Sequence, residues 1–321
     1  MSASQFVTNC TLDALKNAAK QLQNGHLVAF PTETVYGLGA DATNETAVSR
    51  IYSVKGRPSD HPLIVHLPDW QMMGDWAIDI PDYAIDLARA YWPGPMTLVL
   101  KRSELAKDFI TGGQETVGIR VPNQTLALQL LSEFSKLGGK GVAAPSANRF
   151  GQVSPTTADA VSQELGGFLD LGDLILDGGP CSVGLESTII DCTNSAPKIL
   201  RPGAVTIELI EKVTGLKVDS IINSEIRVSG SLENHYAPTA EVLLDVIPQP
   251  GDGFIALDEI PTPQGVIRLA APKDDEDFAH DLYGALRAGD LQNLHRIVVA
   301  QPKGEGIAIA IRDRLKRAAA K

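Results

Sequence analysis

The chain has 321 residues, a length that fits two domains better than one, and 44% of them are hydrophobic, enough for a sizeable core. Its net charge of −11 argues against non-specific nucleic-acid binding, which depends on neutralising phosphates, although local basic groups can still hold a small anion. Three widely spaced cysteines exclude a disulfide scaffold and a cysteine-based zinc site, and the lack of a signal-peptide pattern or of an apolar run of membrane-spanning length predicts a cytoplasmic location.

The first two-thirds of the chain alternates between helical and strand patterns. The first helix is predicted between the capping residue Thr11 and the terminating residue Gly25. Further helices are expected over 45–54, 81–90, 126–137 and 157–165, and strands over 27–30, 63–67, 96–100, 117–121, 142–144, 174–176 and 188–191. This order indicates a mixed α/β domain whose polar turns are rich in Gly, Pro, Ser and Thr.

The pattern changes near residue 213. We interpret 8–212 as the first domain, the polar stretch 213–240 as an interdomain linker, and 241–321 as a second α/β domain. In the second domain, strands are expected over 241–246, 253–257, 266–269 and 296–300, and helices over 277–288 and 306–317. Strands that alternate with helices predict a small parallel sheet.

Four segments carry polar groups that a plain core does not need, and each lies at the end of an apolar run or beside one. They are 31–39, 55–62, 116–122 and 144–148. In an open α/β sheet, ligands bind at the ends of strands, so these segments are candidates for a site.

Each candidate also has a structural explanation. Cations such as Lys55 and Arg57 are favoured at a helix C-terminus without any ligand, and an arginine such as Arg120 is common on the polar face of a strand. Other side chains could be ordinary turn formers or surface carboxylates: Ser146 and Asn148, and Glu33 and Asp41.

Common nucleotide-binding motifs do not explain the chain. There is no G-x-x-x-x-G-K-[ST] sequence, which excludes an ordinary P-loop. Residues 37–42 match G-x-G-x-x-A, and the acidic Asp60 lies about twenty residues further on. However, Asp60 comes before the strand that begins at Leu63, and polar residues separate the preceding strand from the glycines, so we do not interpret 37–42 as a dinucleotide loop.

Seven segments in order resemble the Sua5/YrdC/YwlC family, the threonylcarbamoyl-AMP synthases. They are PTETVYGLGADA at 31–42, KGRP at 55–58, WPGPMT at 92–97, GIRVP at 118–122, PSAN at 145–148, ESTIID at 186–191 and LRPG at 200–203. The resemblance covers roughly residues 10–210. The region after the linker resembles the C-terminal domain of Sua5-type members through chain length, His235-Tyr236-Ala237-Pro238 and the element pattern.

The resemblance implies both a fold and a reaction. The fold would be a YrdC-like twisted mixed sheet with a concave cavity, followed by a smaller Rossmann-like α/β domain. The reaction would join L-threonine, bicarbonate or CO2, and ATP into threonylcarbamoyl-AMP and pyrophosphate, for the N6-threonylcarbamoyladenosine modification of tRNA. A downstream tRNA threonylcarbamoyltransferase would take the product. No stable nucleic-acid complex and no membrane partner are expected.

The resemblance also implies site residues. The catalytic set would be Lys55, Arg57, Ser146 and Asn148. The threonine site would use Thr34, His66, Arg120, Ala144 through its backbone, and Ser187. The ATP site would use Arg57, His61, Thr116, Ser146, Ser154, Arg201 and Tyr236. Where many members have Asn-Pro-Leu, this chain has His61-Pro62-Leu63, and the charge of an imidazole would titrate near neutral pH.

These residue types suit the implied chemistry, which must hold several anions close together. Arg120 is a fork that can clamp the threonine carboxylate, while Ser187 or Thr34 could bind the threonine hydroxyl. Mg2+ is expected to arrive with ATP, because no protein metal site is evident. Cys181 and Cys192 are interpreted as small core or loop residues. We also expect the linker around His235 and Tyr236 to close over the nucleotide.

Two other functions are compatible with parts of the pattern. The same fold could act as an RNA-binding module, although the net charge of −11 disfavours binding over the whole surface. The related carbamoyl-transferring module of hydrogenase-maturation enzymes would need an acylphosphatase-like segment and cysteine-rich zinc motifs, which this sequence lacks.

Overall fold

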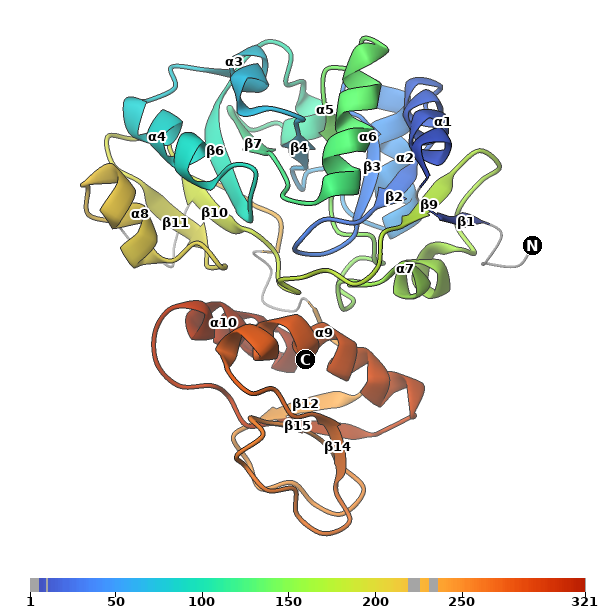
Figure 1. Cartoon of the computed structure of the whole chain (residues 1–321), viewed down its shortest axis with the longest axis vertical. Coiled ribbons are helices and arrows are strands. Elements are labelled where there is room, and N and C mark those ends of the chain that lie inside the picture. The colour runs from blue at the N-terminus through green and yellow to red at the C-terminus, as the bar shows by residue number, and fades with distance from the viewer. Residues whose placement is uncertain (1–5, 10, 219–225, 231–235, 321) are drawn as a thin grey trace.

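Two β-sheets organise the part of the chain described by this computed structural model, which is residues 6–9, 11–218, 226–230 and 236–320. The larger sheet and its helices form the first domain, and a smaller sheet with two helices forms the second (Figure 1). The expected mixed α/β architecture with a second C-terminal domain is confirmed.

The large sheet is mixed and contains eleven strands in the described residues, in the order β1–β9–β2–β3–β8–β4–β7–β6–β10–β11, with β5 beside β6. The strands are β1 (Val7–Asn9), β2 (Val28–Phe30), β3 (Gly37–Asp41), β4 (Ile64–His66), β5 (Ala77–Ile78), β6 (Met96–Arg102), β7 (Thr116–Arg120), β8 (Val142–Ala143), β9 (Leu174–Asp177), β10 (Thr188–Asp191) and β11 (Lys198–Arg201). Many neighbours in this sheet, such as β4 and β7, are distant in sequence, so the sheet gathers residues from separate segments.

Five helices of the first domain begin and end close to where the sequence predicts: α1 (Leu12–Gln23), α2 (Glu45–Lys55), α4 (Asp82–Tyr91), α6 (Thr125–Lys136) and α7 (Ala158–Leu165). The sequence patterns did not predict α3 (Met73–Trp76), α5 (Asp108–Thr111), α8 (Ile207–Thr214) or the 3-10 turn η2 (Trp70–Met72). The Thr11 hydroxyl accepts a hydrogen bond from the Ala14 amide at 3.1 Å, and Gly25 follows the helix with φ +84°. The start of the expected linker at 213 falls inside α8.

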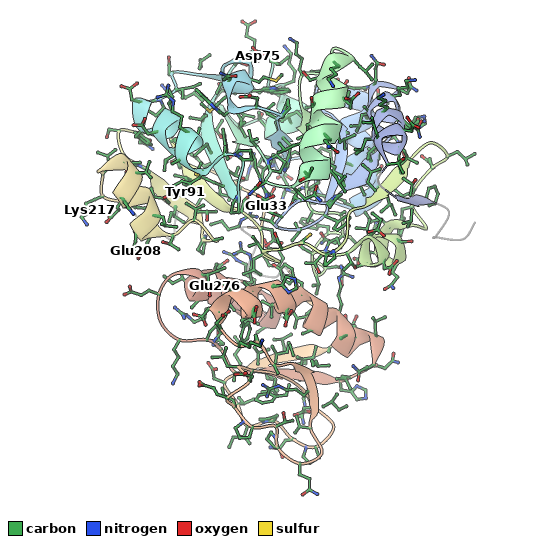
Figure 2. All side chains as sticks on the ribbon, in the orientation of Figure 1. Glu33, Asp75, Tyr91, Glu208, Lys217 and Glu276 are labelled. Carbon is green, nitrogen blue, oxygen red and sulfur yellow. The ribbon has the colours of Figure 1, made fainter. Side chains whose placement is uncertain are left out.

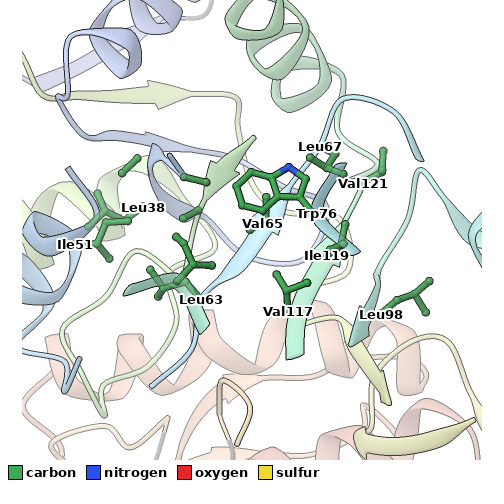
Figure 3. Packing of buried hydrophobic residues seen from close by; sticks show 14 of the residues in the cluster. Leu38, Ile51, Leu63, Val65, Leu67, Trp76, Leu98, Val117, Ile119 and Val121 are labelled. Carbon is green, nitrogen blue, oxygen red and sulfur yellow. The ribbon is translucent and has the colours of Figure 1, made fainter. Parts of the chain in front are cut away.

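The core of the first domain lies around the central strands (Figure 3). Val65 and Ile119 pair across β4 and β7, and Trp76 packs in the same cluster with its ring fully buried. The Trp76 indole donates to the Lys140 carbonyl at 3.1 Å, so its one polar group is satisfied. This packing fixes the ends of β4 and β7, where His66 and Arg120 lie.

The sequence patterns predicted no strand in the glycine-rich segment 37–42. Residues Gly37–Asp41 of this segment form strand β3, which runs antiparallel between β2 and β8. A Cβ added to Gly39 would lie 2.8 Å from Val142 Cγ1 and 2.9 Å from Phe30 Cε1. The glycine therefore permits close strand packing, and the decision against a dinucleotide loop is confirmed.

The second domain contains the small parallel sheet that the sequence predicts, in the order β12–β15–β13–β14. Its elements are β12 (Glu241–Leu244), β13 (Gly253–Ile255), β14 (Ile267–Ala270), α9 (Asp275–Leu291), β15 (Arg296–Val299) and α10 (Ile307–Ala319). Helices α9 and α10 lie between this sheet and the first domain (Figure 1). None of the helices in the described residues is long and apolar enough to cross a membrane.

Candidate active site

One cavity lies beside the ends of the central strands and collects most of the residues that the sequence singled out. Predicted site residues that line it are Arg57, His66, Arg120, Ala144, Ser146, Ser187, Arg201 and Tyr236. These side chains come from the turn after α2, from β4, β7 and β11, from the segment after β8, from the residue before β10, and from the region before the second domain. The strand-end segments therefore do meet at one site.

His66 and Arg120 form one wall of the cavity because they are register partners on the parallel strands β4 and β7. Arg120 Nη2 lies 2.8 Å from Glu33 Oε1, and both side chains are buried. Burial and the neighbouring Arg120 lower the pKa of His66 to about 3, so this imidazole is neutral at physiological pH. This wall presents one fixed cation and one neutral ring.

Ser187 and Arg201 form a second wall, where β10 and β11 pair. Arg201 donates from Nε and Nη2 to the Ser187 carbonyl at 3.1 Å and 2.9 Å, and from Nη2 to the Ser187 hydroxyl at 3.2 Å. The Ser187 hydroxyl also lies 2.7 Å from Thr97 Oγ1 on β6. The guanidinium is thus held by the backbone, and the Ser187 hydroxyl has a fixed orientation.

Arg57 follows the C-terminus of α2 and also lines the cavity. Its Nη2 donates to the Pro62 carbonyl at 3.0 Å and to Ser229 Oγ at 3.2 Å, and Arg201 Nη1 donates to the Ser229 carbonyl at 2.9 Å. Burial lowers the pKa of Arg57 to about 10, which still leaves it charged at neutral pH. Within the described residues, Arg57 Nε and Arg120 Nε have no hydrogen-bond acceptor. Two buried cations therefore keep unused donors at this site.

Lys55 has a different position from the one that its predicted catalytic role suggests. Its side chain is buried, does not line the cavity, and donates to the Ser146 carbonyl at 2.6 Å and to the Asn148 carbonyl. Burial and Arg57 lower the pKa of Lys55 well below its ordinary value. The Asn148 amide donates in turn to the carbonyls of Arg149 and Gln152 at 2.7 Å and 2.8 Å. Lys55 and Asn148 hold the turn that presents Ser146, and neither is a solvated surface group.

The remaining predicted residues lie outside the cavity lining. Thr34 is buried behind Thr32, whose hydroxyl lies 2.9 Å from its own. Thr116 lines a small neighbouring pocket with Ser229, and Ser154 donates to Glu186, which does line the main cavity. His61 is half-buried against Phe150, and burial followed by Arg57 lowers its pKa below the usual value, so its charge titrates in more acidic solution than expected.

Two buried carboxylates belong to the site but were missed. Glu33, considered above as a surface carboxylate, is 4% exposed and paired with Arg120. Glu186 lines the cavity and accepts from Ser154 at 2.6 Å. A buried arginine requires a compensating anion, so Arg120 signalled that some carboxylate must be near, without saying which one. Nothing in the local sequence of Glu186 indicated its partners.

Metal-ligating and nucleophilic groups are sparse in the described residues. No cluster of three or more His, Cys, Asp or Glu side chains there could hold a metal ion. Cys181 and Cys192 are buried, as expected of small core residues, and burial raises the pKa of Cys181 to about 12. Neither thiol is therefore poised as a thiolate nucleophile.

A twisted mixed sheet whose strand ends direct buried arginines, small hydroxyls and a neutral histidine into one cavity defines a protein that binds small anionic ligands. The family described as Sua5/YciO/YrdC, Telomere recombination, matches residues 20–203. A second family model, the threonylcarbamoyl-AMP synthase C-terminal domain, matches 205–320. The chain belongs to the Sua5/YciO/YrdC family and carries the additional C-terminal domain of its longer members.

Individual relatives match over nearly their full length. The chain is 39% identical to a threonylcarbamoyl-AMP synthase of Pyrococcus abyssi, over 95% of this chain and 93% of the relative. It is 38% identical to one of Bacillus subtilis, over 95% and 92%. Among solved structures, that of P. abyssi Sua5 complexed with L-threonine superposes with a TM-score of 0.87 at 36% identity, covering 98% of this chain and 97% of the other.

Proposed function

We propose that this chain is a threonylcarbamoyl-AMP synthase, which makes threonylcarbamoyl-AMP and pyrophosphate from L-threonine, bicarbonate or CO2, and ATP. One observation carries the proposal beyond the family names. Arg57, Arg120 and Arg201 are all buried, come from separate segments, and line a single cavity. ATP, bicarbonate, the threonine carboxylate and the carbamate formed from it all carry negative charge, so the reaction needs fixed cations around a closed space.

The geometry supports a division of the cavity into two halves. Arg120 and the neutral His66 lie together and form the proposed threonine half with Ala144, while Ser187 joins this half from the second wall, where it is bonded to Arg201. Arg57, Ser146, Arg201 and Tyr236 form the proposed ATP half, with His61, Thr116 and Ser154 around it. In this division, Arg120 clamps the threonine carboxylate and the Ser187 hydroxyl recognises the threonine hydroxyl. Thr34 acts through Thr32, which lines the cavity.

The proposed chemistry requires positioning more than covalent catalysis. The neutral threonine amine attacks the carbon of bicarbonate or CO2 and gives a carbamate, with loss of water when bicarbonate is used and of a proton to solvent when CO2 is used. A carbamate oxygen then attacks the α-phosphorus of ATP, the bond to the bridging oxygen breaks, and pyrophosphate leaves with those electrons. Arg57 and Arg201 neutralise charge that develops on the phosphates. Holding both reactants in line can lower the barrier by roughly 7–11 kcal/mol.

Mg2+ belongs to the proposal as a partner of the ATP phosphates. The carboxylates near the cavity are already engaged, Glu33 by Arg120 and Glu186 by Ser154 and by two residues of the second domain. The ion would therefore be held mainly through phosphate oxygens and water, as Mg2+ commonly is. Its contribution when bound is to neutralise phosphate charge.

The segment before the second domain supports the proposed lid. Ser229 accepts hydrogen bonds from Arg57 and Arg201, the two arginines of the proposed ATP half. Tyr236 is 1% exposed and lines the cavity. His235 lies outside the described residues. Closure there would keep water from a hydrolysable adenylate. Tyr236→Ala is expected to weaken ATP binding and shorten the lifetime of the product in an assay of adenylate decay. Unchanged values for both would contradict the lid.

The cellular context is proposed from the same reaction. A tRNA threonylcarbamoyltransferase would consume the adenylate, the protein would act in the cytoplasm, and no stable nucleic-acid complex would form. The domain limits 8–212, 213–240 and 241–321 are part of this proposal.

The decisive experiment measures pyrophosphate release from ATP while threonine, bicarbonate and Mg2+ are each left out in turn. Release that requires all three supports the synthase. Absence of release under every combination, together with salt-sensitive RNA binding, would favour the RNA-binding alternative. Release with another amine would preserve the phosphate chemistry and contradict only the assignment of threonine.

A further inference from the structure

Glu186 joins the two domains inside the candidate site. Its Oε1 accepts from the Ser154 hydroxyl of the first domain at 2.6 Å. Its Oε2 accepts from Tyr283 Oη on α9 at 2.9 Å and from Arg314 Nε on α10 at 2.8 Å. All these partners are buried, and Arg314 and Tyr283 are completely so. One carboxylate that lines the cavity is thus held by two side chains of the second domain.

Arg314 also binds the backbone next to Ser187 and Arg201, which form the second cavity wall. Its Nη2 donates to the Pro202 carbonyl at 3.0 Å and approaches the Glu186 carbonyl at 3.4 Å. Pro202 follows Arg201, and Glu186 precedes Ser187. A single guanidinium therefore bridges the two backbone segments that carry the cavity-lining residues Ser187 and Arg201, and the fork of an arginine suits this position.

Tyr283 and Arg314 also contact the ring of Tyr236. The Tyr236 and Tyr283 rings stack with centroids 5.7 Å apart and an interplanar angle of 25°. The Arg314 guanidinium carbon lies 5.4 Å from the centre of the Tyr236 ring. Stacking and cation–π contact in a buried setting hold this ring in one orientation.

We propose that Arg314 and Tyr283 are positioning residues for the ATP half of the site, so that the second domain completes nucleotide binding through Glu186 and Tyr236. The proposal rests on the synthase function proposed above. It concerns residues that act through others, since neither Arg314 nor Tyr283 lines the cavity. It also gives the second domain a defined task in the reaction.

The charge state of Glu186 explains how this arrangement works. Burial on its own raises the pKa of Glu186, but Arg314, Arg201 and the Ser154 hydrogen bond outweigh it and lower the pKa to about 2. Glu186 is therefore ionised throughout the physiological range and acts only as an acceptor. The Ser154 proton is committed to it, which leaves the Ser154 hydroxyl only its acceptor capacity toward a ligand.

The test uses the full-length chain and steady-state pyrophosphate release, with KM measured separately for ATP and for threonine. Tyr283→Phe removes the hydrogen bond to Glu186 and keeps the ring that stacks on Tyr236. It is expected to raise the KM for ATP about threefold to tenfold, with the KM for threonine within about twofold of wild type. Arg314→Lys keeps a charge but loses the fork, and is expected to raise the KM for ATP by about tenfold or more.

Matched controls exist for both changes. Tyr91, the last residue of α4 in the first domain, is labelled in Figure 2. Its hydroxyl donates to the Leu209 carbonyl at 2.9 Å, and Tyr91→Phe removes this hydrogen bond. Arg312→Lys alters an arginine of the same helix α10 that bonds only the carbonyls of Pro302 and Gly304 in the described residues. Both controls are expected to leave both KM values unchanged.

A purely structural role would lower the melting temperature and the active fraction, and hence kcat, with both KM values unchanged; that result would overturn the proposal. If Arg314→Lys fails to fold, Tyr283→Phe still decides. If the wild type releases no pyrophosphate under any condition, the synthase function fails by itself. Equilibrium ATP binding by calorimetry then tests the positioning role, and equal affinities in wild type and Tyr283→Phe would overturn it.

Discussion

Arg120 faces two carboxylates in the proposed reaction, that of Glu33 and that of threonine. Removal of the Arg120 charge would leave Glu33 buried and unpaired, which would lower the free energy of unfolding by about 3–5 kcal/mol. Because a neutral variant would lose stability as well as threonine binding, its activity would not report on binding alone. Arg120→Lys keeps the charge and removes the bidentate fork. We expect the KM for threonine to rise about tenfold to hundredfold, because a charge-assisted hydrogen bond contributes roughly 1.5–3 kcal/mol, while the KM for ATP stays nearly constant.

Arg102→Lys is the matched control for Arg120→Lys. Arg102 pairs with Asp108 and Glu115, whose side chains are exposed, and such surface pairs contribute about 0–1 kcal/mol. Pyrophosphate release at varied threonine measures both variants. A rise in the KM for ATP in place of the KM for threonine would remove Arg120 from the threonine half.

His61 provides a test based on pH. Burial and Arg57 lower its pKa below 6.5, so the imidazole is neutral at pH 7 and gains its proton only in acidic solution. Protonation adds a cation near the proposed phosphate site. We therefore expect ATP affinity in the wild type to exceed that of His61→Asn increasingly as pH falls from about 6.5 to about 5, and to equal it above pH 7. Calorimetric titration of both proteins with the same ATP solution cancels the ionisation of the nucleotide, and a ratio that does not change with pH would contradict the assignment.

At the scale of elements, Lys55 links helix α2 to the turn at 146–148. Its ammonium donates to the carbonyls of Ser146 and Asn148 from the last turn of the helix, and Gly56 ends that helix with φ +62°. Lys55→Met removes this donor from the buried Asn148 carbonyl and from the partly buried Ser146 carbonyl. We expect the free energy of unfolding to fall by about 2–4 kcal/mol, because each buried acceptor without a partner costs roughly 1–3 kcal/mol.

Denaturant unfolding measures this loss. Lys20→Met, which alters an exposed lysine in the last turn of α1, is the control and is expected to change stability by less than about 0.5 kcal/mol. Equal stability of Lys55→Met and wild type, with activity lost, would instead assign Lys55 a direct role in the reaction.

The elements also show how far the sequence could be interpreted. Local signals placed α1 between Thr11 and Gly25, and apolar runs placed β4, β7 and β10, because capping and periodicity act within a few residues. Segment 37–41 was not expected to be a strand, since glycine disfavours strands unless a neighbour packs closely, as Val142 does on Gly39. Pairings between distant segments, such as Glu33 with Arg120, depend on sheet order, which no local pattern determines.

At the scale of the whole molecule, the second domain docks through its helices. Arg287 on α9 donates to Glu164 at 2.9 Å and to the Val153 carbonyl, next to Ser154 of the proposed ATP site. The overall charge of −11 is compatible with an anion-binding cavity because Arg57, Arg120 and Arg201 are concentrated inside it. Domain docking and nucleotide binding therefore share the same region of the first domain.

Gly184 tests this coupling without any change to Glu186, Tyr283 or Arg314. It has φ +81°, and a Cβ placed there would lie 2.6 Å from the Ala279 carbonyl oxygen and 2.6 Å from the His280 Cα, both backbone atoms of α9. Gly184→Ala must therefore displace α9, the helix that carries Tyr283. We expect the KM for ATP to rise at least about threefold, with the KM for threonine unchanged.

Gly138→Ala separates this displacement from simple backbone strain. Gly138 has φ +92° and no atom within 4 Å of an added Cβ, so it shares the conformational penalty of about 1–2 kcal/mol without any contact with the second domain. Both variants are expected to unfold at lower temperature, but only Gly184→Ala is expected to bind ATP less tightly. If the two lose stability and ATP affinity in parallel, ATP binding does not depend on how α9 docks, since strain alone would then account for both.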